Sequence, residues 1–208
     1  MTQKRIMDTD RRVVIQDQET AFAGAIWDIQ RDTFTIDDAD TPMTREYIEH
    51  PGAVAIVAID EHDRLAMINQ YRHPVRQDCW EIPAGLMDVE GESLLRTAQR
   101  ELTEEADVTA HDWSVLIDHY PSAGSSAEAI RIFLAQDIES VPQADRHTRD
   151  DEEAHLMIRW VPLDEAFEAV MSGAVKNVNA VVGIMATHLV RTTGRNTRPF
   201  DAAFSNQS

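Results

Sequence analysis

The chain has 208 residues, of which 43% are hydrophobic, and this is typical of one folded domain with an extension. Its formal net charge of −18 argues against a nucleic-acid partner, and a phosphate-bearing substrate would need metal ions or local arginines. The sequence contains no apolar run near the roughly 20 residues of a membrane helix and no apolar signal core at its start. With Cys79 as its single cysteine, we expect a cytoplasmic protein without an internal disulfide.

The first half of the chain predicts short β-strands. They are expected at Arg12–Ile15, Ala21–Ile29 and Thr33–Ile36, before a polar link at Asp37–Pro42. Two apolar strands, at Ala53–Ile59 and Leu65–Asn69, should flank the turn residues Asp60–Arg64, and Trp80–Ile82 should form another.

The second half predicts helices as well as strands. Apolar residues recur at helical spacing over about Gly91–Ala106. Beyond it we expect strands at Ser114–Tyr120, Ala129–Ala135 and His155–Val161, helices at Leu163–Met171 and Val175–Val190, and a loose tail from Thr192. Strands interleaved with few helices indicate an α/β fold with a mixed sheet between helices.

One face of the first predicted helix carries glutamates. At about 100° per residue, Glu101, Glu104 and Glu105 lie within roughly a 100° arc. Such like charges destabilise a helix unless a cation lies among them, and carboxylate oxygens suit Mg²⁺ or Mn²⁺. Taken alone, however, such a cluster is more often a solvated acidic face.

The residues around these glutamates resemble the Nudix hydrolase signature. Glu92 precedes Arg100 by eight residues, and the match continues until Asp107 replaces the final glycine; Gly85 lies one residue too far from Glu92. The resemblance implies a Nudix α/β/α sandwich with a mixed sheet, plus an N-terminal β-strand extension. We therefore expect a β extension at residues 1–45, a Nudix domain at 46–191 and a loose tail at 192–208.

Flanking segments resemble the ADP-ribose pyrophosphatase branch of this family, namely Glu49–Val54, Gln70–Pro74, Trp80–Leu86, Tyr120–Glu128 and Asn177–Ala180. The resemblance implies metal-dependent hydrolysis of ADP-ribose to AMP and ribose 5-phosphate by a homodimer with exchanged N-terminal strands. Ala123 stands where the branch carries a proline that marks its specificity. This replacement leaves open a hydrolase of nucleotide sugars, NADH or other nucleoside diphosphate derivatives. A second alternative, since some family members bind ligands without hydrolysing them, is a non-catalytic ADP-ribose-sensing Nudix domain.

The same resemblance implies the catalytic and metal-binding residues. Glu101 and Glu105 would hold Mg²⁺, or alternatively Mn²⁺, together with the Ala84 carbonyl. Glu104 would lie beside them, as a ligand through water or as a group that orients the ligands. Glu92 paired with Arg100 would support the loop. Glu128 would be a further metal ligand or the base that activates water, and the rival base is Glu153 or its neighbour Glu152.

Three residues are candidates for substrate binding. Arg72 would hold the diphosphate or the terminal ribose, because guanidinium binds phosphate oxygens in pairs. Glu81 would meet the adenine or a ribose hydroxyl, and Trp27 would stack on the adenine. The alternatives are a surface ion pair for Arg72, a strand end for Glu81, and a core or dimer-interface position for Trp27.

Overall fold

The computed structural model describes residues 6–37, 39–149 and 156–204, which group into two units. The N-terminal unit contains the chain up to His50 together with the loop Ser122–Glu128. The larger unit contains Pro51–Pro121 and Ala129–Phe204. Each unit has its own sheet structure, and each is described by itself below.

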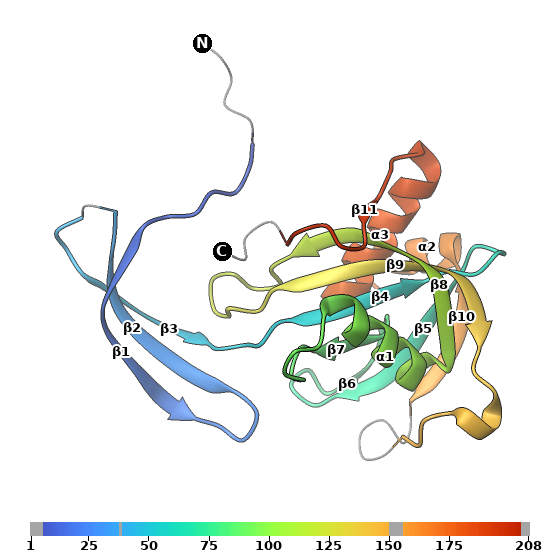
Figure 1. Ribbon diagram of the computed structural model, residues 1–208, viewed down its shortest axis with the longest axis horizontal. Helices are drawn as coiled ribbons and strands as arrows, with labels where there is room; N and C mark the ends of the chain where they lie inside the picture. The colour runs from blue at the N-terminus through green and yellow to red at the C-terminus, as the bar shows by residue number, and fades with distance from the viewer. Residues whose placement is uncertain (1–5, 38, 150–155, 205–208) are drawn as a thin grey trace, which may run out of the picture. The chain divides into compact units, whose positions relative to one another are not determined.

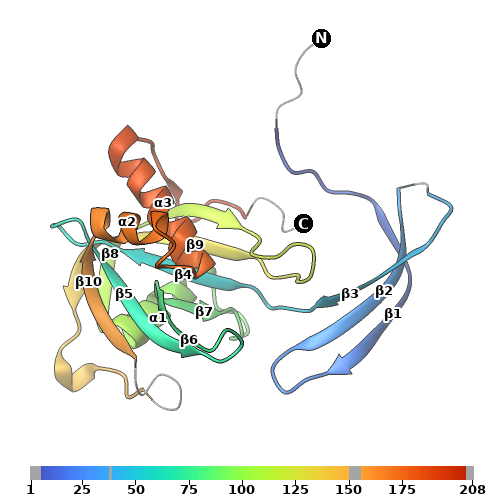
Figure 2. The same cartoon turned by 180° about the vertical axis from the view of Figure 1, so that it is seen from behind.

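The N-terminal unit is an antiparallel sheet of β1 (Val13–Ala23), β2 (Asp28–Ile36) and β3 (Met43–Ile48), in that order (Figure 2). A single strand expected at Ala21–Ile29 is wrong, because the chain reverses between β1 and β2. Gly24 makes this turn: its amide donates to Asp28 Oδ1 over 3.2 Å, and a Cβ there would overlap the Trp27 carbonyl. We did not predict β3, whose partly exposed residues lack a clear apolar alternation.

The loop Ser122–Glu128 belongs to this unit through backbone hydrogen bonds to the end of β3. The Ile48 amide donates to the Ser125 carbonyl over 2.9 Å, and the Ala127 amide donates to the Ile48 carbonyl over 3.0 Å. The loop therefore joins the N-terminal sheet although it follows β3 by more than seventy residues in the sequence.

Two sheets form the centre of the larger unit. The first contains β4 (Ala53–Ala58), β7 (Ala84–Leu86), β8 (Val108–His119), β9 (Ile130–Ser140) and β11 (Arg198–Pro199). Its strand order is β11-β8-β9-β4-β7, and it is a mixed sheet because β4 runs parallel to β9 while the other pairs are antiparallel. The second is antiparallel, in the order β10-β5-β6, and contains β5 (Arg64–Arg72), β6 (Gln77–Glu81) and β10 (Met157–Pro162).

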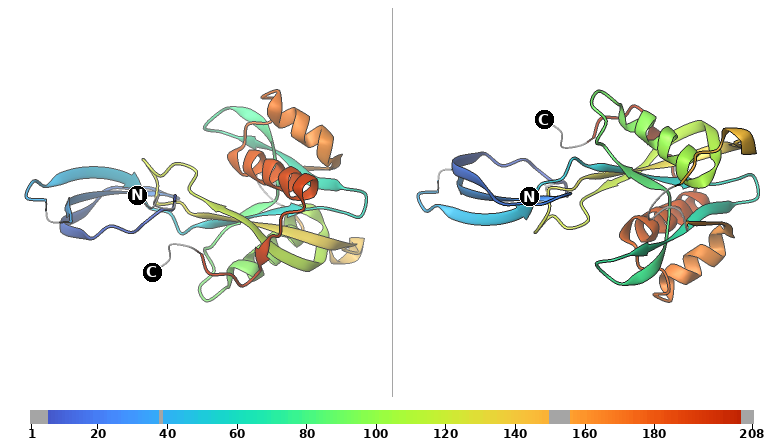
Figure 3. Two further views of the ribbon diagram at one scale, coloured as in Figure 1. Left: turned by 90° about the horizontal axis from the view of Figure 1, so that it is seen from above. Right: turned by 90° about the horizontal axis from the view of Figure 1, so that it is seen from below.

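Helices cover both faces of these strands. α1 (Leu94–Ala106) lies on one side, and α2 (Leu163–Met171) and α3 (Val178–Thr193) lie on the other, as Figure 3 shows in green and in orange to red. The burial of β4 explains the arrangement: Ala55 and Val57 pack into a core with α2 and α3, whereas Val54 and Ile56 pack against α1. An apolar run buried on both faces requires cover on both faces. The predicted α/β/α sandwich with a mixed sheet is confirmed.

The helix ends follow their capping residues. α1 starts at Leu94, three residues later than predicted, because Ser93 caps it by accepting the Arg96 amide over 3.3 Å. Likewise, Asn177 accepts the Ala180 amide over 3.0 Å, so α3 starts at Val178 and not at residue 175. The range predicted for α2 matches the structure, and a short 3-10 turn spans Gln143–Asp145.

The prediction of a loose tail is wrong for residues 198–204. Arg131, which is only 2% exposed, forms a bidentate ion pair with Asp118 at 2.8 and 3.0 Å and donates to the Ala202 carbonyl over 2.7 Å. Its guanidinium also lies 5.1 Å from the ring centroid of Phe204. Arg198 adds a third bond to Asp118 at 2.8 Å. A buried charge that needs partners thus fixes the tail against β8 and β9. Among the described residues, no helix is long and apolar enough to cross a membrane.

Candidate active site

Helix α1 lies beside the short strand β7 (Figure 1), and two of its glutamates, Glu101 and Glu105, contact the start of that strand. The adjoining face of the helix is fixed in the core by Ala98, Leu102 and Ala106. Burial of that face sets the rotation of the helix, so that Glu105 becomes 4% exposed, while the Glu101 and Glu104 side chains remain 12% and 29% exposed. The core packing of α1 therefore determines where its glutamates point.

Glu101 and Glu105 both lie against the backbone of Ala84 and Gly85. The Ala84 amide donates to Glu105 Oε2 over 2.8 Å. A Cβ at Gly85 would overlap the carboxylate of Glu101, so only glycine lets the backbone approach that side chain without displacing it. Two carboxylates and a peptide segment with a carbonyl oxygen form a donor set that suits a hard divalent cation.

Arg100 is the cation that accompanies these glutamates in the structure. Its guanidinium contacts Glu92 at 3.2 Å, Glu101 at 2.5 Å and Glu104 at 3.2 Å. Burial lowers the pKa of Arg100, but its hydrogen bonds and charge interactions with the three glutamates outweigh burial and raise this pKa above its usual value. The predicted Glu92–Arg100 pair is confirmed. The repulsion expected among the helix glutamates is therefore offset in part by an arginine of the same helix.

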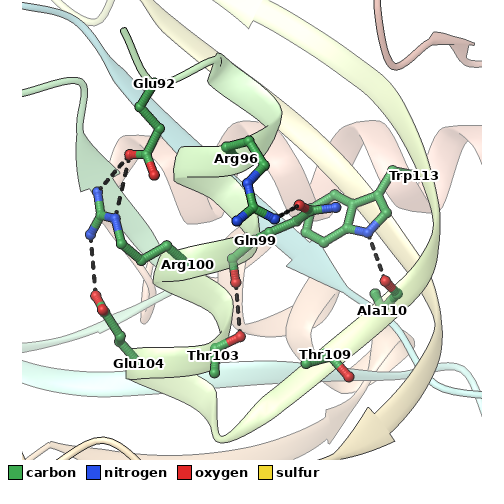
Figure 4. Close-up of a pocket in the computed structure, with 9 residues that line it drawn as sticks. All are labelled: Glu92, Arg96, Gln99, Arg100, Thr103, Glu104, Thr109, Ala110 and Trp113. Atoms are coloured by element: carbon green, nitrogen blue, oxygen red, sulfur yellow. Dashed lines mark hydrogen bonds and ion pairs between the residues drawn. The ribbon is translucent and has the colours of Figure 1, made fainter. Parts of the chain in front are cut away.

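The outer side of this network lines a hollow of about 490 Å³ between α1 and β8 (Figure 4). Figure 4 shows Arg100 reaching Glu92 on one side and Glu104 on the other, while the indole of Trp113 closes the far wall. The Trp113 indole nitrogen donates to the Ala110 carbonyl over 2.9 Å, which fixes the ring.

Within the described part of the chain, no group of three or more histidine, cysteine, aspartate and glutamate side chains is assembled as a ligand cluster.

Arg72 and Glu81, both predicted to bind substrate, contact each other in the larger unit. Arg72 Nε and Nη2 donate to the two oxygens of Glu81 over 2.9 and 2.7 Å, and Gln70 adds a longer contact of 3.4 Å. Glu81 is 3% exposed, whereas the Arg72 side chain is 43% exposed. Glu81 therefore holds one edge of a guanidinium whose side chain is half in solvent.

The N-terminal unit holds the remaining predicted residues that the structure describes. The half-buried Trp27 stacks on His50 with ring centroids 4.6 Å apart and an interplanar angle of 17°. His50 Nε2 lies 3.6 Å from Glu128 Oε1. In the same unit, Ala123 lines a hollow of about 430 Å³ between its loop and the sheet. The sequence indicates no role for His50, although the segment Glu49–Val54 that contains it resembles the pyrophosphatase branch.

Glu152 and Glu153 lie outside the described residues. The segment before them is fixed to the end of α1: Arg149 donates to the Glu104 carbonyl over 2.9 Å and pairs with Asp107 at 3.0 Å. Asp107 adopts the left-handed conformation, with φ 55°, at the C-cap of α1. In the sequence, the only indication of these contacts is that an acidic residue, Asp107, replaces the final glycine of the signature.

Comparisons with known proteins agree with the geometry. A model of the NUDIX domain matches residues 49–180. The chain is 40% identical over 183 residues to an ADP-ribose pyrophosphatase of Mycobacterium tuberculosis, covering 88% of this chain and 86% of that protein. It is 32% identical over 176 residues to an ADP-ribose pyrophosphatase of Bacillus subtilis, covering 83% and 90%. A crystal structure described as an ADP compounds hydrolase superposes with a TM-score of 0.72 at 20% identity, covering 91% of this chain and all of that one, and this likeness concerns the fold.

Proposed function

The chain belongs to the Nudix hydrolase family, and on this premise we propose that it hydrolyses the diphosphate bond of ADP-ribose to AMP and ribose 5-phosphate. The observation that carries the proposal is the approach of Glu101 and Glu105 to the Ala84–Gly85 backbone, within a chain 40% identical to a protein of that activity. In the reaction, a water oxygen bonds to one phosphorus and the bond from that phosphorus to the bridging oxygen breaks. The water's protons are released to a base or to solvent, so each product ends in a phosphate monoester.

The proposed cofactor is Mg²⁺, with Mn²⁺ as the alternative. Glu101, Glu105 and the Ala84 carbonyl would hold it, since hard oxygen donors match these ions. A bound divalent ion supplies charge neutralisation at the phosphate oxygens, which a protein of net charge −18 otherwise repels. The role of Arg100 is to hold Glu101 and Glu104 in fixed rotamers.

A carboxylate is the proposed acceptor of a proton from the attacking water. We propose Glu128, as a further metal ligand or as this base, on the family resemblance. The rival base is Glu153 or Glu152. Single Glu→Gln substitutions at these positions separate the candidates. Loss of the base should lower kcat, and raising the pH should partly restore kcat in that variant alone.

Arg72 is the proposed diphosphate or ribose contact. Its bidentate pair with Glu81 supports this role. A guanidinium that is already fixed by a carboxylate loses less side-chain entropy on binding a phosphate than a freely rotating one does. Glu81 remains a candidate for a substrate hydroxyl, although its two oxygens already accept from Arg72. Trp27 is the proposed adenine platform, with one face on His50.

The assembly and location of the protein are also proposals. We propose a homodimer in the cytoplasm, with residues 1–45 as the β extension that exchanges strands, 46–191 as the Nudix domain and 192–208 as the tail. The exposed apolar residues of β1, which are Val13, Val14 and Ile15, support burial against a second copy. The presence of one cysteine supports a reducing compartment.

The direct test is to incubate the purified protein with Mg²⁺ and ADP-ribose and to identify the products by mass spectrometry. Release of AMP and ribose 5-phosphate is expected, with one ¹⁸O atom incorporated from labelled water. Glu105→Gln serves as the matched control for a contaminating hydrolase. Absence of turnover with every nucleoside diphosphate derivative would contradict the proposal.

A second candidate substrate class is favoured by Ala123. This residue replaces the proline that marks ADP-ribose specificity in the branch, and it lines the hollow in the N-terminal unit. Nucleotide sugars and NADH are the compounds to compare. The test measures kcat/KM for these compounds and for ADP-ribose in the wild-type protein and in Ala123→Pro. If the variant prefers ADP-ribose more strongly than the wild type does, position 123 contributes to substrate specificity.

A further inference from the structure

Three side chains of the N-terminal unit form a connected row that leads to Glu128. Trp27 comes from the turn between β1 and β2, His50 follows β3, and Glu128 ends the loop Ser122–Glu128. The indole and the imidazole are nearly parallel, with centroids 4.6 Å apart, and the imidazole Nε2 faces Glu128 Oε1 at 3.6 Å. The three segments are far apart in the sequence, so this contact arises from the fold.

The backbone around the row is fixed on both sides. The amides of Ile48 and Ala127 form the two hydrogen bonds that join β3 to the loop, two residues before His50 and one before Glu128. The Glu128 amide also donates to Ser126 Oγ over 3.1 Å. With both backbones held, the remaining freedom at Glu128 is that of its side chain.

The side chains differ in exposure in a way that assigns their roles. The His50 side chain is 7% exposed, while that of Glu128 is 26% exposed. Burial and stacking on an indole restrict the rotation of the His50 ring, whereas a partly exposed glutamate has several rotamers unless a neighbour selects one.

We propose that His50 is a positioning residue that selects the reactive rotamer of Glu128, and that Trp27 holds the imidazole for this purpose. The proposal rests on the proposed function, because Glu128 has its reaction role only there. It gives the N-terminal sheet a part in catalysis that is separate from any role in dimer formation. Partners that orient a reactive carboxylate commonly contribute 10- to 100-fold to activity.

The test uses two substitutions that separate the ring from its nitrogen. His50→Phe keeps a flat ring against Trp27 but removes the nitrogen that faces Glu128, and His50→Gln restores an amide donor at a similar reach. We expect kcat to fall about 10- to 100-fold in His50→Phe, with KM changed less, and to recover partly in His50→Gln. The matched control is His62→Phe, since His62 lies at the same 3.6 Å from Glu61 but is exposed and outside the site.

A double substitution tests whether His50 acts through Glu128. We expect Glu128→Gln to lower kcat at least about 100-fold, and His50→Phe to cause no further loss in that background. Losses that multiply, or a His50→Phe protein with wild-type kcat, would overturn the proposal. Wild-type kcat in Glu128→Gln would overturn it as well.

A measurement without turnover separates this proposal from the proposed function. In the metal-free protein, the side-chain carboxyl ¹³C signal of Glu128 should shift in His50→Phe and stay in place in His62→Phe. If the wild-type protein hydrolyses no diphosphate, the proposed function fails, while the ¹³C signal still reports whether His50 positions Glu128. An unchanged Glu128 signal in His50→Phe overturns the positioning role whatever the activity.

Discussion

Gly85→Ala should remove activity while leaving the fold intact. The added Cβ would occupy the space of the Glu101 carboxylate, so that side chain must rotate away from the Ala84–Gly85 backbone. A carboxylate displaced by about 1 Å or more from a reacting centre costs on the order of 100-fold in rate. We therefore expect kcat/KM for ADP-ribose to fall about 100-fold or more.

The stability change worked from the same contact is small. Forcing Glu101 off its rotamer costs about 0.5–1.5 kcal/mol, and alanine lowers the entropy of the unfolded chain, which stabilises by about 0.4–1 kcal/mol where the backbone is compatible. The φ of Gly85 lies outside the left-handed region, so alanine can adopt its backbone. The two effects nearly cancel, and the free energy of unfolding should stay within about 1 kcal/mol of the wild-type value.

Gly173→Ala is the matched control because it should lower stability and leave activity unchanged, the opposite of what Gly85→Ala should do. Gly173 has φ 75° and no atom within 4 Å of an added Cβ, so alanine there is strained but contacts nothing. It should lose about 1 kcal/mol of stability and retain full kcat/KM. Urea unfolding and steady-state kinetics on both variants provide the measurement. A Gly85→Ala protein with wild-type kcat/KM, or one whose activity falls only in step with its stability, would refute the reasoning.

Further substitutions test other parts of the larger unit. Glu105→Gln should keep its stability, since the amide oxygen still accepts from Ala84, but lose about 100-fold or more in kcat, as measured by AMP release; wild-type rates would refute a metal role. Burial raises the pKa of Asp60, but hydrogen bonds from its turn outweigh burial and lower this pKa below 3.8. Asp60→Asn should therefore lower the free energy of unfolding by about 1 kcal/mol near pH 7. Urea titrations should show that this difference between wild type and variant is constant above about pH 5 and disappears as the pH falls through the lowered pKa of Asp60. Arg131→Met leaves Asp118 buried with one partner fewer and should cost about 3 kcal/mol, with faster proteolysis of the tail; unchanged protection of the tail would count against the anchor.

The parts of the fold that were predicted depend on local pattern. The alternation of Ala55 and Val57 with Val54 and Ile56 is visible in the sequence, and so is the need for cover on both faces of that strand. The helical spacing of Ala98, Leu102 and Ala106 fixes the buried face of α1 and hence the face that carries the glutamates. These signals act over a few residues, which is why they survive without tertiary information.

The parts that were missed depend on contacts between distant segments. Nothing near Arg131 in the sequence indicates that it will bind the Ala202 carbonyl, 71 residues later. The same is true of Arg149, whose partner Asp107 is 42 positions away, and of His50, whose partner Glu128 is 78 positions away. A charged residue in an apolar strand signals only that a partner exists, and the fold decides which one.

A domain boundary near residue 45 does not separate the two units completely, because the loop Ser122–Glu128 is grouped with the N-terminal sheet. In sequence order, that loop lies in the middle of the segment 46–191, and it carries both Ala123 and Glu128. In the structure, it is hydrogen-bonded to β3 and grouped with the N-terminal sheet. The pairing of Ile48 with Ser125 and Ala127 means that β3 supports this loop directly, so a chain shortened to its Nudix segment would lose the strands that hold Ile48 in place. The N-terminal sheet therefore supports the loop that carries Ala123, the proposed specificity residue, and Glu128, the proposed base.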